Sequence, residues 1–170
     1  MMKIVFDSDA LIKLGKTKRF PKILEKMDAC ISEEVFKECV TEGKTRLYED
    51  AFRLEEMIQK GRLRVERTNE RMEAKGILKE VFNLGRGEKS TLHLYFKNKP
   101  QAIVSDDQAF LDVLYVNNIP FLTTTDLLVR LVELKKIKRD ECRETLEEIK
   151  PYIPHKRYLE SLEIINGGKK

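Results

Sequence analysis

The sequence contains no tryptophan, two histidines and three cysteines among its 170 residues. Cys30, Cys39 and Cys142 form an odd set at unrelated spacings, which argues against a disulfide framework and against a zinc knuckle. His93 and His155 have no sequence neighbours that would make either one a catalytic base. So few cysteines are typical of proteins kept in a reducing compartment, and we expect a cytoplasmic protein.

Long apolar runs and common nucleotide-binding motifs are also missing. No stretch is long enough to span a membrane, and the N-terminus leads directly into an expected strand, so we expect neither membrane contact nor a signal peptide. No GxGxxG follows the first strand, and no Walker-type phosphate-binding motif occurs. The spaced pair Asp7 and Asp9 lacks the residue that a phosphatase DxDxT or DxDxV motif needs next. Dinucleotide-binding, P-loop and phosphatase classes are therefore disfavoured.

The chain does contain a balanced mixture of residues, 41% hydrophobic and 36% charged, which indicates an ordered globular protein. Its length suits one domain with a sizeable core. The 33 basic and 29 acidic residues leave a net charge of +4. That excess would suit an enzyme that holds phosphodiesters, but a solvated surface of mixed charge explains an excess of this size better, so net charge does not identify a partner.

Short apolar runs alternate with stretches of helical periodicity, which predicts an α/β protein with a central parallel β-sheet flanked by helices on both sides. The expected sheet has about four to five short strands. They lie at residues 3–6, 29–31, 63–65, 101–105 and 119–122. The expected helices lie at residues 10–14, 20–27, 33–40, 46–60, 69–82, 88–96, 108–116, 123–135 and 140–149. We expect residues 1–150 to form a single domain and residues 151–170 to be a loosely packed C-terminal extension.

Acidic residues occur where these elements begin and end. Asp7 ends the first strand, Glu88 begins the helix after a glycine-rich turn, and Asp106 and Asp107 follow the strand at residues 101–105. Parallel strands bring their carboxyl ends to one sheet edge, where open α/β folds place ligands. Carboxylates gathered there would repel each other unless a cation compensates them, and an all-oxygen set suits Mg²⁺ or Mn²⁺ rather than zinc. The sequence therefore predicts a divalent-cation site.

Four segments in chain order resemble the successive motifs of PIN-domain proteins, which are metal-dependent ribonucleases. They are VFDSDALI, EEVFKECV, LGRGEKSTLHLY and AIVSDDQAFLDV. The resemblance covers about residues 2–150 and implies a PIN-like fold. Each motif alone is loose, and the order and spacing of all four carry the resemblance.

The resemblance also implies site residues. The implied catalytic and metal-binding carboxylates are Asp7, Glu38, Glu88 and Asp107, with Asp106 close by as an alternative or outer ligand. Ser8 and Ser105 would orient carboxylates or water, and Arg86 and Lys89 would contact phosphates. One or two Mg²⁺ or Mn²⁺ ions would activate water for in-line attack on an RNA phosphodiester. Glu88 stands where many family members carry an aspartate, so its longer side chain would place the metal differently.

Each acid also has an ordinary explanation. Asp7 would serve as a helix cap, Glu38 as a solvent-facing residue, and Asp106-Asp107 as a turn. Glu88 would gain about 0.3–1 kcal/mol from the helix N-terminus without any metal. All four positions would have to match the family pattern by accident for these explanations to hold together.

Two functions remain after the resemblance is considered. The first is an endoribonuclease acting on single-stranded or structured RNA, for which the resemblance also suggests a role as the toxin that pairs with an antitoxin protein, as in VapBC-type pairs. The alternative is a PIN-like domain that binds RNA or protein with little or no cleavage. We also expect a homodimer. The leucine-rich helix at residues 127–134 is expected to pack in the core first, and to contribute to a dimer face second.

Overall fold

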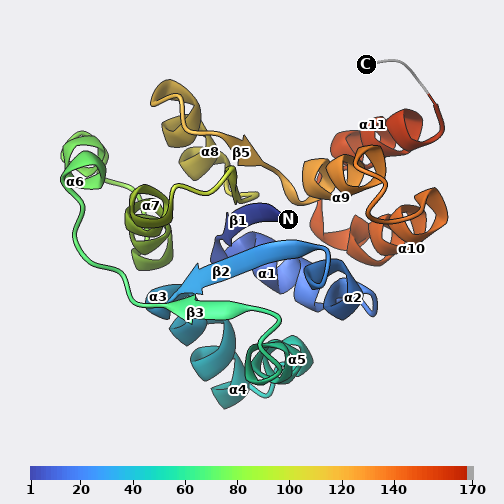
Figure 1. The fold of residues 1–170 in the computed structure, drawn as a ribbon, viewed down its shortest axis with the longest axis horizontal. Helices are drawn as coiled ribbons and strands as arrows, with labels where there is room; N and C mark the ends of the chain where they lie inside the picture. The colour runs from blue at the N-terminus through green and yellow to red at the C-terminus, as the bar shows by residue number, and fades with distance from the viewer. Residues whose placement is uncertain (168–170) are drawn as a thin grey trace.

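The five strands of the protein form one parallel sheet with the order β3–β2–β1–β4–β5 (Figure 1). The computed structural model describes residues 1–167. The strands are β1 (Met2–Phe6), β2 (Met27–Ser32), β3 (Arg64–Glu66), β4 (Ala102–Val104) and β5 (Phe121–Leu122). The predicted α/β class and five-stranded parallel sheet are confirmed. All five strands are short, as expected for apolar runs buried between helix layers.

Helices follow each strand and return the chain to the same end of the sheet. They are α1 (Ser8–Gly15), α2 (Phe20–Leu24), α3 (Glu33–Phe36), a π-helix (Lys37–Glu42), α4 (Gly43–Thr45), α5 (Glu49–Gln59), α6 (Met72–Leu78), α7 (Arg86–Asn98), α8 (Gln108–Val116), α9 (Thr124–Glu133), α10 (Arg139–Ile149), a 3₁₀ turn (Lys150–Tyr152) and α11 (His155–Ile165). Such strand–helix–strand connections give a parallel sheet wrapped on both sides.

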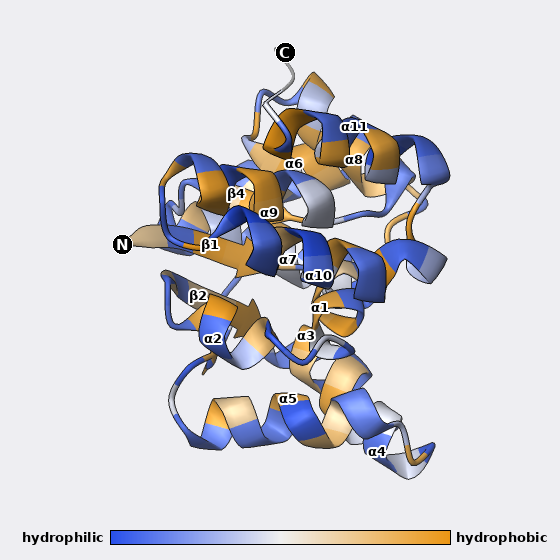
Figure 2. Cartoon of the chain, turned by 90° about the vertical axis from the view of Figure 1, so that its right-hand side faces the viewer, coloured by the Kyte–Doolittle hydropathy of each residue, from blue (hydrophilic) through white to orange (hydrophobic). Residues whose placement is uncertain are grey.

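The two faces of the sheet carry separate hydrophobic clusters. Ile4 and Phe6 of β1 join the larger cluster, which includes buried residues of α1, α2, α9, α10 and α11. Val5 points the other way and packs with Leu94 of α7. Ile103 of β4 joins the second cluster, formed with α6, α7 and α8. Alternation along β1 therefore divides the helices into two layers. Figure 2 shows β1 in the hydrophobic colour and the outer helix α10 largely in the hydrophilic one.

The order of the strands creates a switch point between β1 and β4. From β1 the chain proceeds outward through β2 to β3, and then crosses back to place β4 on the other side of β1. Phe6 of β1 is paired with Val104 of β4, so both strands end at the same level. The residues that follow them, Asp7 and Ser105, are consequently neighbours. Open α/β sheets place their ligands at such a point.

Four predicted helices differ clearly from the structure. The helix expected at 20–27 ends at Leu24, and Met27 already begins β2. The helix expected at 33–40 continues through the π-helix and α4, and Gly43 lies within it. The helix expected at 46–60 begins only at Glu49, because Leu47 has a positive φ of 59° that breaks the helical path. The helix expected at 69–82 is limited to α6. Local periodicity indicated each helix, but turn geometry set its ends.

The expectation of a loosely packed extension is wrong for its helical part. Helix α11 packs against α9, and its Tyr158 and Ile165 are 4% and 2% exposed as members of the larger cluster. The apolar positions of this helix fall on one face, which is why it is held by the core. Residues 168–170, the end of the expected tail, lie outside the described residues. Within residues 1–167, no helix has the length and apolar character needed to cross a bilayer.

Candidate active site

Asp7 is a buried carboxylate at the carboxyl end of the central strand. Its side chain is almost fully enclosed at 3% exposure, and its backbone N–H donates to the carbonyl of Val104 across the β1–β4 switch point at 2.9 Å. Ser105 Oγ donates a hydrogen bond of 2.9 Å to Asp7 Oδ2. The net effect of its surroundings raises the pKa of Asp7 from 3.8 to about 7. Burial raises the pKa most, the hydrogen bonds from Ser105 and from the backbone of Ser8 lower it, and the charges of Glu88 and Asp9 raise it.

Glu38 lies in the π-helix, where it joins two other elements of the site. Ser8 Oγ at the start of α1 donates to Glu38 Oε2, and the backbone N–H of Gly87 in α7 donates to Oε1 at 3.0 Å. A Cβ on Gly87 would collide with this carboxylate, whose Cδ would lie 3.0 Å away. Glycine at position 87 is therefore what lets α7 approach Glu38 so closely.

Glu88 lies in the first turn of α7, as predicted. Its Oε2 accepts a hydrogen bond of 2.5 Å from the backbone N–H of Gly85, the residue that precedes the helix. Burial raises the pKa of Glu88, the hydrogen bond from Gly85 lowers it, and the charges of Asp107, Glu38 and Asp9 raise it further. Glu88 therefore experiences the electrostatic field of the three other acidic side chains.

The neighbours Asp106 and Asp107 point to different partners. Both oxygens of Asp106 are engaged: Oδ1 accepts from the backbone N–H of Thr124 at 2.9 Å, and Oδ2 accepts from Thr124 Oγ1 at 2.6 Å and pairs with Lys13 Nζ at 3.1 Å. Arg157 of α11 lies 3.7 Å from Oδ1. Asp106 therefore joins α1, α9 and α11 through contacts with its carboxylate.

Asp107 has a less occupied carboxylate. Its Oδ1 caps α8 by accepting from the backbone N–H of Phe110 at 2.9 Å, and its backbone N–H donates to Ser105 Oγ at 3.2 Å. Within residues 1–167, its Oδ2 takes part in no hydrogen bond or ion pair. Its charge also raises the pKa of Glu88, so the two carboxylates lie near each other.

The structure adds one acid, Asp9, which the sequence analysis considered only as half of an incomplete phosphatase motif. Asp9 raises the pKa of both Asp7 and Glu88, and it pairs with Lys13 Nζ at 2.7 Å. Its side chain is 48% exposed. The sequence contained a signal for Asp9. The predicted helix begins just after Asp7, so Asp9 lies in its first turn and at the same end of the helix as Asp7. Asp9 and Lys13 together connect the site to Asp106.

The basic residues expected to contact phosphate are exposed. Arg86 and Lys89 lie in the first turns of α7 on either side of Glu88. Among residues 1–167 neither side chain has an ion-pair partner. Their charges are therefore available to an anion next to the acidic edge.

The acids fit a hard cation by their chemistry. Asp7, Glu38, Glu88, Asp107 and Asp9 come from four separate segments and supply only oxygen atoms, the donors that Mg²⁺ and Mn²⁺ prefer. The raised pKa values of Asp7 and Glu88 show that ionising both is costly unless a positive charge compensates them.

The side chains of these acids are not arranged around one common metal position in the structure. In the described part of the chain, no three acidic, histidine or cysteine side chains are arranged as a ready metal-ligand set. Glu38, Glu88 and Asp107 instead accept from hydroxyl or backbone donors. Rotation of these side chains would be required for them to share one ion.

Comparison of the sequence with models of protein families identifies the family of the chain. The family model described as PIN domain matches residues 3–166. The chain belongs to the PIN-domain family. The suspected resemblance is thereby confirmed, and it extends through α11, beyond the expected limit at residue 150. PIN-domain proteins are in general nucleases and typically use divalent metal ions. A search of curated proteins found no match to this PIN domain.

Proposed function

We propose that this PIN domain is a Mg²⁺- or Mn²⁺-dependent endoribonuclease that hydrolyses RNA phosphodiester bonds. The observation that carries the proposal is the electrostatic coupling of the buried Asp7 to Glu88, and of Glu88 to Glu38 and Asp107, at the switch point of the sheet. Asp7 is 3% exposed and has no cationic partner among the described residues. Buried carboxylates are normally paired, so an acid with a purely structural role would not be expected in this position.

Asp7, Glu38, Glu88 and Asp107 would hold the ion, with Asp7 as the most rigid ligand because Ser105 fixes it. A bound divalent ion supplies a polarised water and neutralises charge on the phosphate. Ser8 would keep the Glu38 carboxylate turned toward α1 and α7. The exposed Arg86 and Lys89 would hold the phosphates on either side of the scissile bond without selecting a base sequence.

Asp107 is proposed as the fourth ligand in preference to Asp106. Its Oδ2 has no partner within residues 1–167, whereas both oxygens of Asp106 already accept hydrogen bonds from Thr124 and its Oδ2 also pairs with Lys13. Releasing Asp106 would leave the cation of Lys13 without that carboxylate. Asp106 is proposed to position α9 and α1 behind the site.

A toxin role in a toxin–antitoxin pair, a cytoplasmic location and a homodimer are further parts of the proposal. The leucine-rich helix offers little apolar surface for a dimer, because Leu127, Leu128 and Leu131 are 0% exposed in the core. The exposed side chains Leu47, Tyr48 and Phe52 around α4 and α5 offer an alternative apolar surface. Sedimentation of the full chain tests the dimer, and an adjacent gene that neutralises toxicity tests the toxin role.

The test of nuclease activity uses a fluorescently labelled RNA with and without Mn²⁺. We expect Mn²⁺-dependent cleavage that is lost in Asp7→Asn and Asp107→Asn and retained in Asp112→Asn, an exposed acid in the middle of α8. Mn²⁺ binding measured by electron paramagnetic resonance should weaken in the first two variants only. RNA binding without any cleavage by the parent protein would support the alternative, a PIN domain that binds but does not cut.

A further inference from the structure

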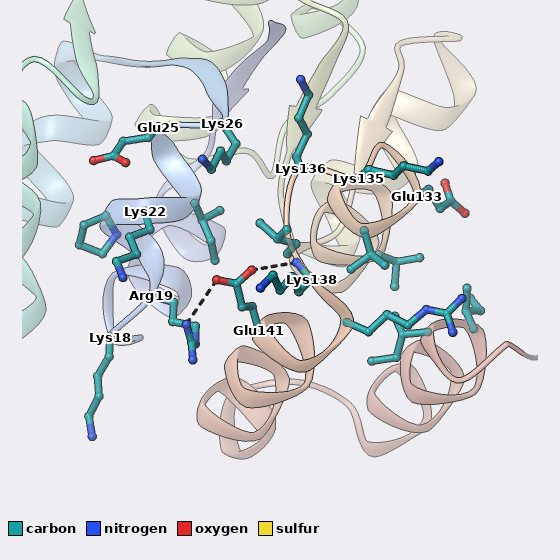
Figure 3. A pocket seen from close by; sticks show the side chains of 18 of the residues that line it. Lys18, Arg19, Lys22, Glu25, Lys26, Glu133, Lys135, Lys136, Lys138 and Glu141 are labelled. Atoms are coloured by element: carbon teal, nitrogen blue, oxygen red, sulfur yellow. Dashed lines mark hydrogen bonds and ion pairs between the residues drawn. The ribbon is translucent and has the colours of Figure 1, made fainter.

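A large groove lies between α2 on one side and α9, α10 and α11 on the other (Figure 3). Its volume is about 1140 Å³. It shares Lys26 and Lys136 with a smaller depression lined by the first residues of β1 and β4, so it lies beside the amino ends of the strands. The acidic site lies at their carboxyl ends. Five residues of β1 separate the two edges by about 17 Å.

The groove is strongly basic. Nine lysine and arginine side chains line it against three glutamates, a local excess larger than the net charge of +4 carried by the entire chain. The three glutamates already have partners. Glu25 pairs with Arg62, Glu141 pairs with Arg19, and Glu133 pairs with Arg130. The acids in the groove therefore do little to neutralise its lysines.

Seven cations of the groove have no ion pair within residues 1–167. Lys18, Lys22 and Lys26 belong to the α2 wall. The opposite wall carries the segment between α9 and α10, with Lys135, Lys136, Lys138 and Arg139. Figure 3 shows lysines of both walls on either side of the groove. Two facing rows of free cations match a polyanion passing between them.

The floor of the groove distinguishes between polyanions. Four of its aliphatic side chains are nearly covered, with Ile23 at 3%, Val129 at 5%, Ile165 at 2% and Ile137 at 9% exposure, and three others, Pro21, Val132 and Ile164, are partly exposed. An amphipathic protein helix would have only these three partly exposed side chains to bury, next to seven cations without ion pairs in the described part of the chain. None of the lining residues is aromatic, so unpaired bases have no stacking platform. What remains is contact with a chain of phosphates.

We propose that this groove is an auxiliary RNA-binding site that holds the sugar-phosphate backbone of the substrate away from the site of cleavage. The inference rests on the proposed nuclease function and adds the substrate class to it: RNA long enough to extend from the carboxyl edge of the sheet around to the amino edge. A tetranucleotide centred on the acids is too short to reach the groove. Binding in the groove is independent of sequence, because lysines bind phosphates as point charges.

The binding experiment measures the anisotropy of a labelled 30-nucleotide RNA in EDTA, which prevents metal-dependent cleavage. The combined variant Lys22→Gln, Lys26→Gln and Lys136→Gln should bind about tenfold more weakly, and the slope of log affinity against log salt should fall by about 2. The matched control removes three exposed lysines outside the groove, Lys79, Lys99 and Lys156, and should stay within about twofold of the parent. Equal losses in both triple variants would overturn the proposal.

A second measurement separates this inference from the nuclease proposal. Cleavage of a tetranucleotide in Mn²⁺ should be unchanged in the groove variant, while cleavage of the 30-nucleotide RNA at subsaturating concentration should fall about tenfold. RNA binding that depends on the groove, without any cleavage, would reject the proposed nuclease activity and support the proposed RNA-binding role of the groove. Polyglutamate that competes as well as RNA of the same charge would instead assign the groove to an acidic protein and overturn the RNA proposal.

Discussion

Ser105 Oγ donates a 2.9 Å hydrogen bond to Asp7 Oδ2 across two neighbouring parallel strands. Ser105 is fully buried, and the same oxygen accepts the backbone N–H of Asp107 at 3.2 Å. One hydroxyl therefore connects the acid that follows β1 with the acid that caps α8. It also favours the charged form of Asp7, against the effect of burial.

Ser105→Ala should raise the pKa of Asp7 further, because the hydrogen bond that lowers it is removed. Mn²⁺ must displace the proton of Asp7, so its affinity at pH 6 should fall by roughly three- to tenfold, with a smaller difference at pH 9. Titration of Mn²⁺ at several pH values measures this. Ser161→Ala, a buried serine in α11, is the control. An equal loss of affinity at every pH would contradict the electrostatic role of Ser105.

Asp7 should also make the metal-free protein less stable as the pH rises. Its pKa is about 7 in the folded protein and 3.8 ordinarily, so the folded chain retains a proton that the unfolded chain has lost between about pH 4 and pH 7. The free energy of unfolding should fall in that window by up to about 1.4 kcal/mol per pH unit and then level off.

Asp7→Asn removes this contribution, since an amide can still accept from Ser105 but carries no charge. Urea unfolding in EDTA should show the variant more stable than the parent at pH 8, with the difference shrinking toward pH 4. Comparison of the two proteins at each pH cancels the titration of other groups. A constant difference from pH 4 to pH 8 would show that Asp7 does not have a raised pKa.

Gly87→Ala tests the close approach of α7 to Glu38. The new Cβ would collide with the Glu38 carboxylate and turn it away from Ser8 and Gly87. Cleavage should fall at least about tenfold, while the stability changes by no more than about 1 kcal/mol, because alanine favours the helix. Gly76→Ala in α6 is the matched control, since nothing lies within 4 Å of its Cβ. Unchanged cleavage in Gly87→Ala would remove Glu38 from the site.

Asp106 and Asp107 should respond oppositely to the same substitution. Asp106→Asn places an amide beside Lys13 and breaks a largely buried ion pair, so it should cost about 3 kcal/mol of stability. Asp107→Asn keeps the cap of α8, because asparagine caps as well as aspartate, but it should abolish cleavage. Thermal unfolding and cleavage measured on both variants decide between the two acids. Loss of cleavage at unchanged stability in Asp106→Asn would reverse the assignment.

The sequence was most informative where local rules decide structure. Helix α8 has the bounds predicted for it, because Asp107 caps its start and Asn117 follows its end. The position of Glu88 in the first turn of α7 followed from the preceding glycines. Local rules failed at residues 33–45, where packing against α5 and α1 continues the helix through a π-helical segment that propensity does not encode.

The chain by itself determined the parallel α/β class, the family and the acidic residues at the strand ends, because hydrophobic periodicity and short motifs depend on neighbours in sequence. Only the tertiary structure decided that Asp106 pairs with Lys13 while Asp107 faces Glu88, and that Asp9 joins the acids. It alone also gathered the lysines of α2 and of the α9–α10 segment into one groove. Lys13 and Asp106 are 93 positions apart and the lysines of the two groove walls more than 100, and no local pattern specifies such proximity.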